Sequence, residues 1–221
     1  MTKQAFKWIT REKRSKTGKL NLNSTGLAQI PEELLHMSWL EELYLSCNRI
    51  TKIENLDTLT NLKILSLARN QISEIEGLGS LTNLESLFLD ENQLTEIKNL
   101  NNLAKLKGLV LQENKITEIK NLEVLVNLEG LILSRNQITE IKNLDHLINL
   151  KELELCRNQI SEIKNLEKLT ELRDLCLIKN NITELKNLDA LQHLEYLKLL
   201  GNSIINVGYL DRFRQLKYLD I

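Results

Sequence analysis

The chain contains very little proline, few glycines and few aromatic residues. Its 221 residues include one proline, Pro31, and eight glycines, and aromatic residues make up 4% of the total. No segment therefore has the composition of a disordered linker. No stretch is apolar over 18 residues, about the shortest length expected of a membrane-spanning helix. The sequence predicts a folded domain without a transmembrane segment.

Charge and cysteine are also limited. The 29 basic and 30 acidic residues leave a net charge of −1, which predicts no bulk attraction to nucleic acid or membrane. The first residues are basic and contain no long apolar run, so we expect no secretory signal. The cysteines, Cys47, Cys156 and Cys176, are odd in number and form no C-x-x-C pair. Free thiols are typical of a reducing compartment, so we expect a cytoplasmic protein.

One asparagine recurs at a constant step of 22 residues, in a frame that residues 84–94 show clearly as L-x-x-L-x-L-x-x-N-x-L. The L-x-L stretch alternates as a strand does, so its two leucines point to the same side. A buried asparagine can bond backbone groups of its own turn and of a neighbouring turn. We therefore expect a structural ladder of stacked asparagines: Asn48, Asn70, Asn92, Asn114, Asn136, Asn158, Asn180 and Asn202.

This period and frame resemble those of leucine-rich repeat proteins. The resemblance implies an α/β repeat solenoid, a horseshoe whose parallel β-sheet lines the concave face. Residues 1–19 lie outside the period and place Ala5, Trp8 and Ile9 on one helical face, as expected of an N-terminal capping helix. The other interpretation of this stretch is a basic amphipathic segment for an anionic partner or membrane surface. Residues 20–199 form the array, with a first repeat of 23 residues followed by 22-residue repeats, and residues 200–221 form the last repeat and C-terminal cap.

Two groups within this class share further features with the chain. Residues 40–45 and 53–56 are similar to repeats of the cytosolic regulatory subunit of protein phosphatase-1. Residues 201–220 resemble the C-terminal cap of that type, with Ser203 where the family has proline. The T-N-L triplets at 60–62 and 82–84 are similar to internalin repeats of bacterial surface adhesins. The first resemblance implies a phosphatase catalytic subunit as one partner, although its binding residues cannot be matched one by one.

No residue pattern points to catalysis or to a metal. His36, His146 and His193 lie in different turns without companions at metal-ligand spacing, and no phosphate-binding or nucleophile motif occurs. We therefore expect no enzyme activity, metal or cofactor. A glutamate column from Glu74 to Glu184 runs beside a lysine column from Lys98 to Lys186, which predicts a solvated outer ladder of opposite charges. A second asparagine column, beginning at Asn55, is expected to cap the outer turn.

Residues that break the period are the candidates for function. On the strand surface, Tyr44, Phe88, Val110 and Ile132 form a predicted apolar stripe beside the small residues Ser86, Gly108 and Gly130. The other interpretation is that such residues merely suit a strand surface. The flank next to the asparagines changes from acidic to basic, in Glu91, Glu113, Arg135 and Arg157. Other candidate contacts on this face are Glu42, Glu152, Asp174, Ile178 and Tyr196, and Cys156 and Cys176 are predicted to lie close together there.

These patterns predict a non-catalytic scaffold that binds a protein partner on its concave sheet face. Two alternatives stay open: a secreted or surface adhesin of the internalin type, and the sensor segment of a larger multidomain protein. An apolar concave face would also permit self-association, and no nucleic-acid partner is expected.

Overall fold

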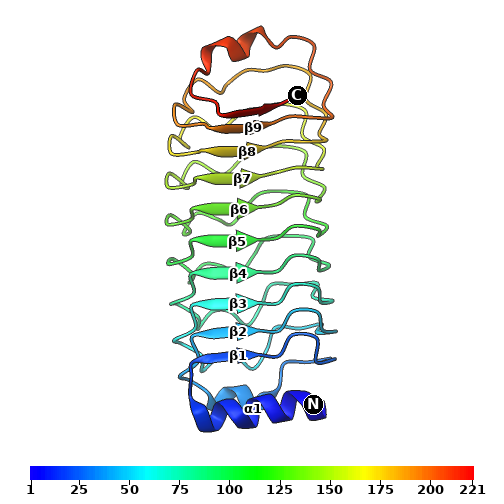
Figure 1. The fold of residues 1–221 in the computed structure, drawn as a ribbon, viewed down its shortest axis with the longest axis vertical. Coiled ribbons are helices and arrows are strands. Elements are labelled where there is room, and N and C mark those ends of the chain that lie inside the picture. Colours follow the sequence, from blue (N-terminus) through cyan, green and yellow to red (C-terminus); the bar gives the residue numbers. More distant parts are fainter.

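The computed structural model describes residues 1–221, except for the side chain of residue 211. The described residues form a ten-stranded parallel sheet whose strands follow one another in sequence order (Figure 1). The strands are β1 (Lys19–Asn21), β2 (Glu42–Tyr44), β3 (Ile64–Ser66), β4 (Ser86–Phe88), β5 (Gly108–Val110), β6 (Gly130–Ile132), β7 (Glu152–Glu154), β8 (Asp174–Cys176), β9 (Tyr196–Lys198) and β10 (Tyr218–Asp220). The remaining elements are helix α1 (Lys3–Ser15) and two 3-10 helices, η1 (Glu32–His36) and η2 (Gly208–Arg212).

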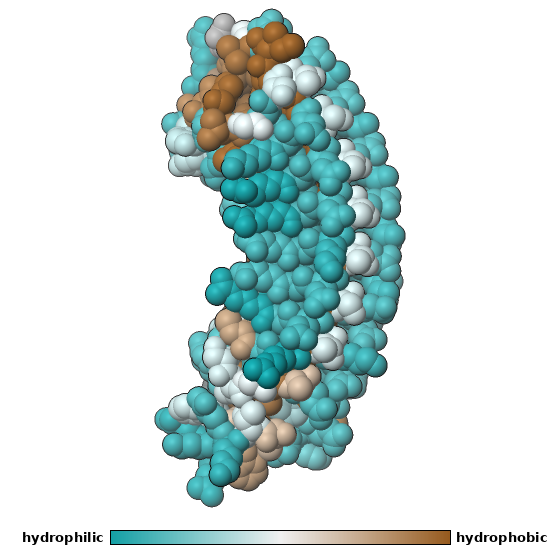
Figure 2. Space-filling model, turned by 90° about the vertical axis from the view of Figure 1, so that its right-hand side faces the viewer, coloured by the Kyte–Doolittle hydropathy of each residue, from teal (hydrophilic) through white to brown (hydrophobic). Residues whose placement is uncertain are grey.

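The array is an arc, with its strands on the concave side (Figures 1 and 2). Each strand pairs with the next at the register that the 22-residue period predicts, so that Leu65 lies beside Leu87 and Leu87 beside Leu109. The strands are short and the return segments consist mainly of turns, so the leucine and isoleucine positions of one repeat complete a core layer only by stacking on the next. The predicted leucine-rich repeat horseshoe is confirmed. No helix among the described residues is long and apolar enough to cross a membrane.

Helix α1 covers the open end of the first turn. Thr2 caps its N-terminus by accepting a 3.2 Å hydrogen bond from the Ala5 amide, and Lys16 ends it in the left-handed region at φ 46°. Ala5 and Ile9 are buried, as predicted, but Trp8 is 36% exposed. The third buried position belongs to Glu12, only 4% exposed. Its carboxylate fits there because backbone and side-chain donors from residues 15–18 and 39 surround it.

The C-terminal end is closed less completely. The Tyr209 hydroxyl donates to Asp189 at 2.6 Å and accepts from the Leu188 amide at 3.1 Å, which holds η2 against the preceding turn. Leu210 and Phe213 are buried beneath it. Leu219 of β10 is 43% exposed, whereas its counterparts in β2 to β9 are fully buried. Figure 2 shows the resulting apolar area at this end of the arc.

Candidate protein-binding surface

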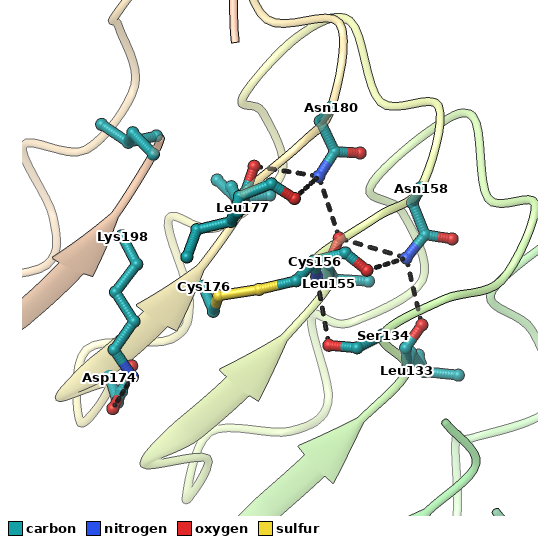
Figure 3. Close-up of a disulfide and its surroundings, with 12 residues drawn as sticks. Leu133, Ser134, Leu155, Cys156, Asn158, Asp174, Cys176, Leu177, Asn180 and Lys198 are labelled. Carbon is teal, nitrogen blue, oxygen red and sulfur yellow. Dashed lines mark hydrogen bonds and ion pairs between the residues drawn. A yellow bond between two sulfur atoms is a disulfide. The ribbon is translucent and has the colours of Figure 1, made fainter. Parts of the chain in front are cut away.

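The concave surface is held in place by the asparagine ladder behind it. The Asn114 amide group donates to Leu111 O of its own turn and to Leu89 O of the preceding turn, both at 3.0 Å. Its carbonyl oxygen accepts from the Leu94 amide at 2.9 Å. The same set of contacts joins Asn158 and Asn180 to their neighbouring turns (Figure 3). Because a ladder asparagine follows each of the strands β2 to β9, these strands present their outward side chains at a fixed spacing.

The residue before each ladder asparagine adopts a left-handed backbone. Glu91 has φ 51°, Glu113 φ 53° and Arg135 φ 56°, and Arg157 and Lys179 share this conformation. A turn of this kind directs the side chain out along the edge of the sheet, which explains why the column is polar and charged. Arg69 pairs with Glu91 at 2.7 Å, and Arg135 pairs with Glu113 at 3.1 Å. The two predicted acidic positions are thus neutralised, and among the described side chains Arg157 and Lys179 have no carboxylate within ion-pair distance.

The apolar stripe is shorter than predicted. Phe88, Val110 and Ile132 are paired neighbours on β4, β5 and β6, but Ser66 separates Tyr44 from Phe88. All four stripe residues are partly buried rather than fully exposed. Tyr44 belongs instead to a polar cluster at the N-terminal end, where its hydroxyl donates to Glu42 at 2.7 Å. Glu42 in turn forms a 2.7 Å ion pair with Lys19, whose ammonium lies over the Tyr44 ring.

Small residues lie beside the three contiguous apolar residues. Ser86, Gly108 and Gly130 are paired neighbours, and each lies two residues before the stripe residue of its own strand. Neither glycine has a positive φ. A Cβ added at Gly108 would lie 3.8 Å from Ser86 Oγ, and one added at Gly130 would lie 3.7 Å from Glu152 Oε2. These are ordinary contact distances, so the fold itself does not require glycine at either position. Because glycine has no side chain, the sheet surface is lower at Gly108 and Gly130 than at Val110 and Ile132, and this lower area is called the hollow below.

Carboxylates gather on strands β7 and β8 of the concave surface. Glu152 and Glu154 lie on β7, and Asp174 on β8 forms a 2.8 Å ion pair with Lys198 on β9. Burial raises the pKa of Glu154 above its usual range, and repulsion from Glu152 adds to this effect. The other carboxylate oxygen of Asp174 is buried without a hydrogen-bond partner among the described side chains. On the strands themselves one lysine faces three carboxylates, and the cations Arg157 and Lys179 lie at the sheet edge. A cation from outside the chain is therefore favoured at Glu152 and Glu154 and not over this whole half of the surface.

Cys156 and Cys176 form a disulfide between neighbouring turns on this face (Figure 3). Their Cα atoms are 5.6 Å apart, a separation that disulfides commonly span. Their proximity agrees with the predicted register, but the expectation of three free thiols is wrong for this pair. Cys47 is free and exposed. Of the remaining predicted contacts, Ile178 is partly buried at the end of this surface, and Tyr196 on β9 is exposed.

The outer columns hold the turns together on the other side. Lys142 lies 2.8 Å from Glu118 and 3.6 Å from Glu140, and Lys164 repeats the arrangement one turn later. Asn99 donates to Ile75 O at 2.7 Å, as expected of the second asparagine column. A third asparagine column was not predicted: Asn61, Asn83, Asn127 and Asn149 each donate to a carbonyl of the preceding turn. The sequence feature that indicates this column is an asparagine-leucine pair that recurs shortly before the strands at multiples of 22 residues.

The three histidines lie apart from one another. His36, His146 and His193 are all exposed, in separate turns. Among the described side chains, no three His, Cys, Asp or Glu residues are placed to hold a metal ion. The concave surface combines apolar side chains, two glycines and charged side chains of both signs.

Comparison with known proteins agrees with this architecture. Models of leucine-rich repeats match residues 16–72, 60–102 and 126–168. No curated protein sequence matches the chain. An internalin, InlF of Listeria monocytogenes, superposes with a TM-score of 0.87 at 29% identity, covering 96% of this chain and 68% of its own. A leucine-rich repeat protein of Leptospira interrogans gives a TM-score of 0.83 at 31% identity, covering 91% of this chain and 54% of its own.

A third similar structure contains a bound partner. The ectodomain of the Arabidopsis thaliana receptor kinase GASSHO1/SCHENGEN3 was solved in complex with Casparian strip integrity factor 2. It gives a TM-score of 0.69 at 26% identity, covering 87% of this chain and 28% of its own. This chain therefore spans about half to two thirds of the two bacterial proteins and a smaller part of the plant receptor.

Proposed function

Because this chain belongs to the leucine-rich repeat family, we propose that it is a non-catalytic scaffold that binds a protein partner on its concave surface. The similar solved structures support an interaction scaffold in general terms. The proposal for this face rests chiefly on one observation, the hollow at Gly108 and Gly130 beside Phe88, Val110 and Ile132. Glycine inside a strand often marks a place where another molecule approaches closely.

The neighbouring charges define the partner further. Glu152 and Glu154 lie on β7, the strand next to Ile132 on β6. Adjacent strands are about 5 Å apart, so an apolar group in the hollow and a cation at these carboxylates would be separated by roughly 5–10 Å. The expected ligand is a protein segment that carries an apolar side chain and a lysine or arginine at this separation. Partial burial of Glu154 strengthens its interaction with such a cation.

The test compares capture of partners by the wild-type chain and by three variants. Phe88→Glu places a charge in the hollow, and Gly130→Val fills it with a side chain that a strand accepts. Gly79→Val is the matched control, since Gly79 also lacks a positive φ and lies in a return segment outside the strands. A partner from the source organism, identified by mass, should be retained by the wild type and the control and lost by both hollow variants. Equal retention by all four proteins would remove the concave surface from the proposal.

That the partner is a phosphatase catalytic subunit remains a prediction. It depends on the resemblance to the phosphatase-1 regulatory type, and the similar structures described above do not include such a complex. Co-purification with a phosphatase of this class from the source organism is the direct test. Its absence from the captured proteins, while another partner is retained, would remove this candidate and leave the scaffold proposal intact.

The disulfide favours a second candidate, a secreted or surface adhesin. Disulfides persist in oxidising compartments and are rare in the cytosol. The expectation of a cytoplasmic location depended on free thiols. Cys156 and Cys176 do not support that expectation, because they are joined in a disulfide. Fractionation of the source organism, with alkylation of thiols before lysis, tests both locations. A surface fraction with the pair oxidised supports the adhesin, and a cytoplasmic fraction with reduced thiols supports the original expectation.

A further inference from the structure

The charges of α1 differ from those of the rest of the molecule. Residues 1–16 contain six basic side chains and one acidic one, so with a net charge of −1 overall, residues 17–221 carry −6. In the array, most charged columns are paired, as Lys142 is with Glu118 and Lys151 with Glu129. Among the described side chains, the ion pairs include none of the six basic residues of the N-terminal segment: Lys3, Lys7, Arg11, Lys13, Arg14 and Lys16. The helix is therefore a concentrated, uncompensated positive charge.

The single acidic residue of this segment does not reduce that charge at the surface. Glu12 is buried and faces inward, where it accepts hydrogen bonds from Thr17 Oγ1 at 2.6 Å and from the Gly18 amide at 3.0 Å. Two of the cations are held over aromatic rings, Arg11 over Trp8 and Lys16 over Trp39. Such contacts leave the cationic charge in place.

The helical period places the cations on the outer face. Ala5, Ile9 and Glu12 point into the array, and the opposite side of the same helix carries Lys3, Lys7 and Arg14, all exposed. Two aromatic side chains flank this basic stripe. Phe6 is 56% exposed on one side, and Trp8 is 36% exposed on the other. Neither is used to close the core, so both are available to an external surface.

The position of α1 makes its whole length accessible to a flat surface. The helix lies across the end of the arc, approximately perpendicular to the long axis of the array (Figure 1). Its buried face packs on β1 and the first turn, so its basic face points away from the rest of the protein. A plane can approach this end without meeting the turns of the array.

We propose that the outer face of α1 is a docking surface for an anionic phospholipid membrane, with the array standing away from it. Cations attract the negative lipid headgroups, and flanking aromatic side chains suit the boundary between headgroups and acyl chains. A nucleic acid duplex also attracts cations, but its bases are stacked inside and are reached only through the grooves, so it offers no apolar layer to Phe6 and Trp8. This surface lies at the opposite side of the helix from the array and is separate from the concave surface.

The attraction is expected to be additive and sensitive to salt. Each lysine or arginine near an anionic membrane strengthens partitioning by roughly fivefold, corresponding to about 1 kcal/mol. Neutralising two of them should weaken partitioning by roughly 25-fold. Because the charges are exposed, raising the ionic strength from about 0.05 M to 0.5 M should screen the attraction and release the protein.

The experiment measures co-sedimentation of the full chain with vesicles of phosphatidylcholine alone and with vesicles containing 30% phosphatidylglycerol. The test variant is Lys7→Gln with Arg14→Gln. The control is Lys52→Gln with Lys168→Gln, which removes the same charge from exposed positions in the array. Circular dichroism of all three proteins verifies that they fold alike, since none of the four side chains enters the core.

Salt-sensitive binding to the anionic vesicles, lost by the α1 variant and kept by the control, is the expected result. Absence of binding to anionic vesicles at low salt overturns the proposal. Equal loss by both double variants also overturns it, because net charge and not this face would then be responsible. Tight binding to a 20-base-pair DNA duplex without binding to vesicles assigns the surface to nucleic acid instead.

Discussion

The Trp39 indole donates a 3.2 Å hydrogen bond to the Glu12 carboxylate, across 27 residues of chain. This contact joins α1 to the turn that it covers. The Glu12 carboxylate also accepts hydrogen bonds from the hydroxyls of Ser15 and Thr17 and from the Gly18 amide. One carboxylate therefore holds both the end of the helix and the segment that leads into β1. A buried carboxylate in a helix that caps an apolar core is stable only because these donors surround it.

Glu12→Gln should lower the free energy of unfolding at pH 7 by about 1–3 kcal/mol, since an amide replaces an ionised acceptor. Burial raises the pKa of Glu12. The hydrogen bonds from Thr17, Trp39, Gly18 and Ser15 together lower this pKa by more than burial raises it, so the net shift is downward. A lowered pKa gives stability above the ordinary carboxyl pKa that is lost as the pH falls through the shifted value. Denaturant unfolding from pH 7 to pH 3 should therefore show the two proteins converging in acid. A difference independent of pH would contradict this role.

Asn114→Leu should destabilise the centre of the array. The substitution leaves the Leu94 amide and the Leu89 and Leu111 carbonyls without their partner, and each buried unpaired group costs about 1–3 kcal/mol. Gln137→Leu is the control, because Gln137 is exposed. Urea denaturation should show a lower midpoint for Asn114→Leu and little change for the control. Similar midpoints for the two variants would mean that the ladder contributes little.

Gly77→Ala should also destabilise the array, for a different reason. Gly77 has φ 65°, and a Cβ there would lie 2.3 Å from Ile53 O, a backbone atom that cannot move alone. A left-handed alanine costs roughly 1–2 kcal/mol before this clash is counted. Gly79→Ala lies nearby without either problem and should be neutral within about 0.5 kcal/mol. Thermal unfolding of the two variants distinguishes them, and equal melting temperatures would refute the backbone argument.

The disulfide predicts the number of reactive thiols. Native protein purified without reductant should show one thiol, that of Cys47, and three after reduction in denaturant. Replacing both paired cysteines by serine should lower the free energy of unfolding by up to about 3 kcal/mol, because the link closes a loop of about 20 residues in the unfolded chain. Three thiols that react before reduction would show that the pair is open under those conditions.

The fold was predictable because each repeat obeys the same local rule. Leu87, Leu109 and Leu131 are buried in register, as alternation and the 22-residue step require. The pairing of the outer glutamate and lysine columns followed from the same step, since residues one period apart lie one strand spacing apart.

Features that occur once were harder to predict. Trp8 was assigned to the buried face of α1 by its apolarity, but Glu12 takes the third buried position because donors from residues 15–18 and 39 converge there. Helical spacing gives no information on such distant donors. The closeness of Cys156 and Cys176 was derived from the register, whereas the bond between them depends on Cα separation and side-chain direction.

The asparagine ladder has a consequence for how this protein changes length. Each of its bonds connects one turn only to the turn beside it, and residues 22 apart meet equivalent partners. Removing residues 49–70, which lie between α1 and the hollow, would join Asn48 to residue 71, which follows Asn70 in the intact chain, so the same contacts would form again across the junction. Duplication or loss of one such unit in the gene therefore changes the distance between α1 and the hollow by one strand spacing without disrupting the core. The distance between the two surfaces of this protein can therefore change during evolution in steps of about 5 Å, one repeat at a time.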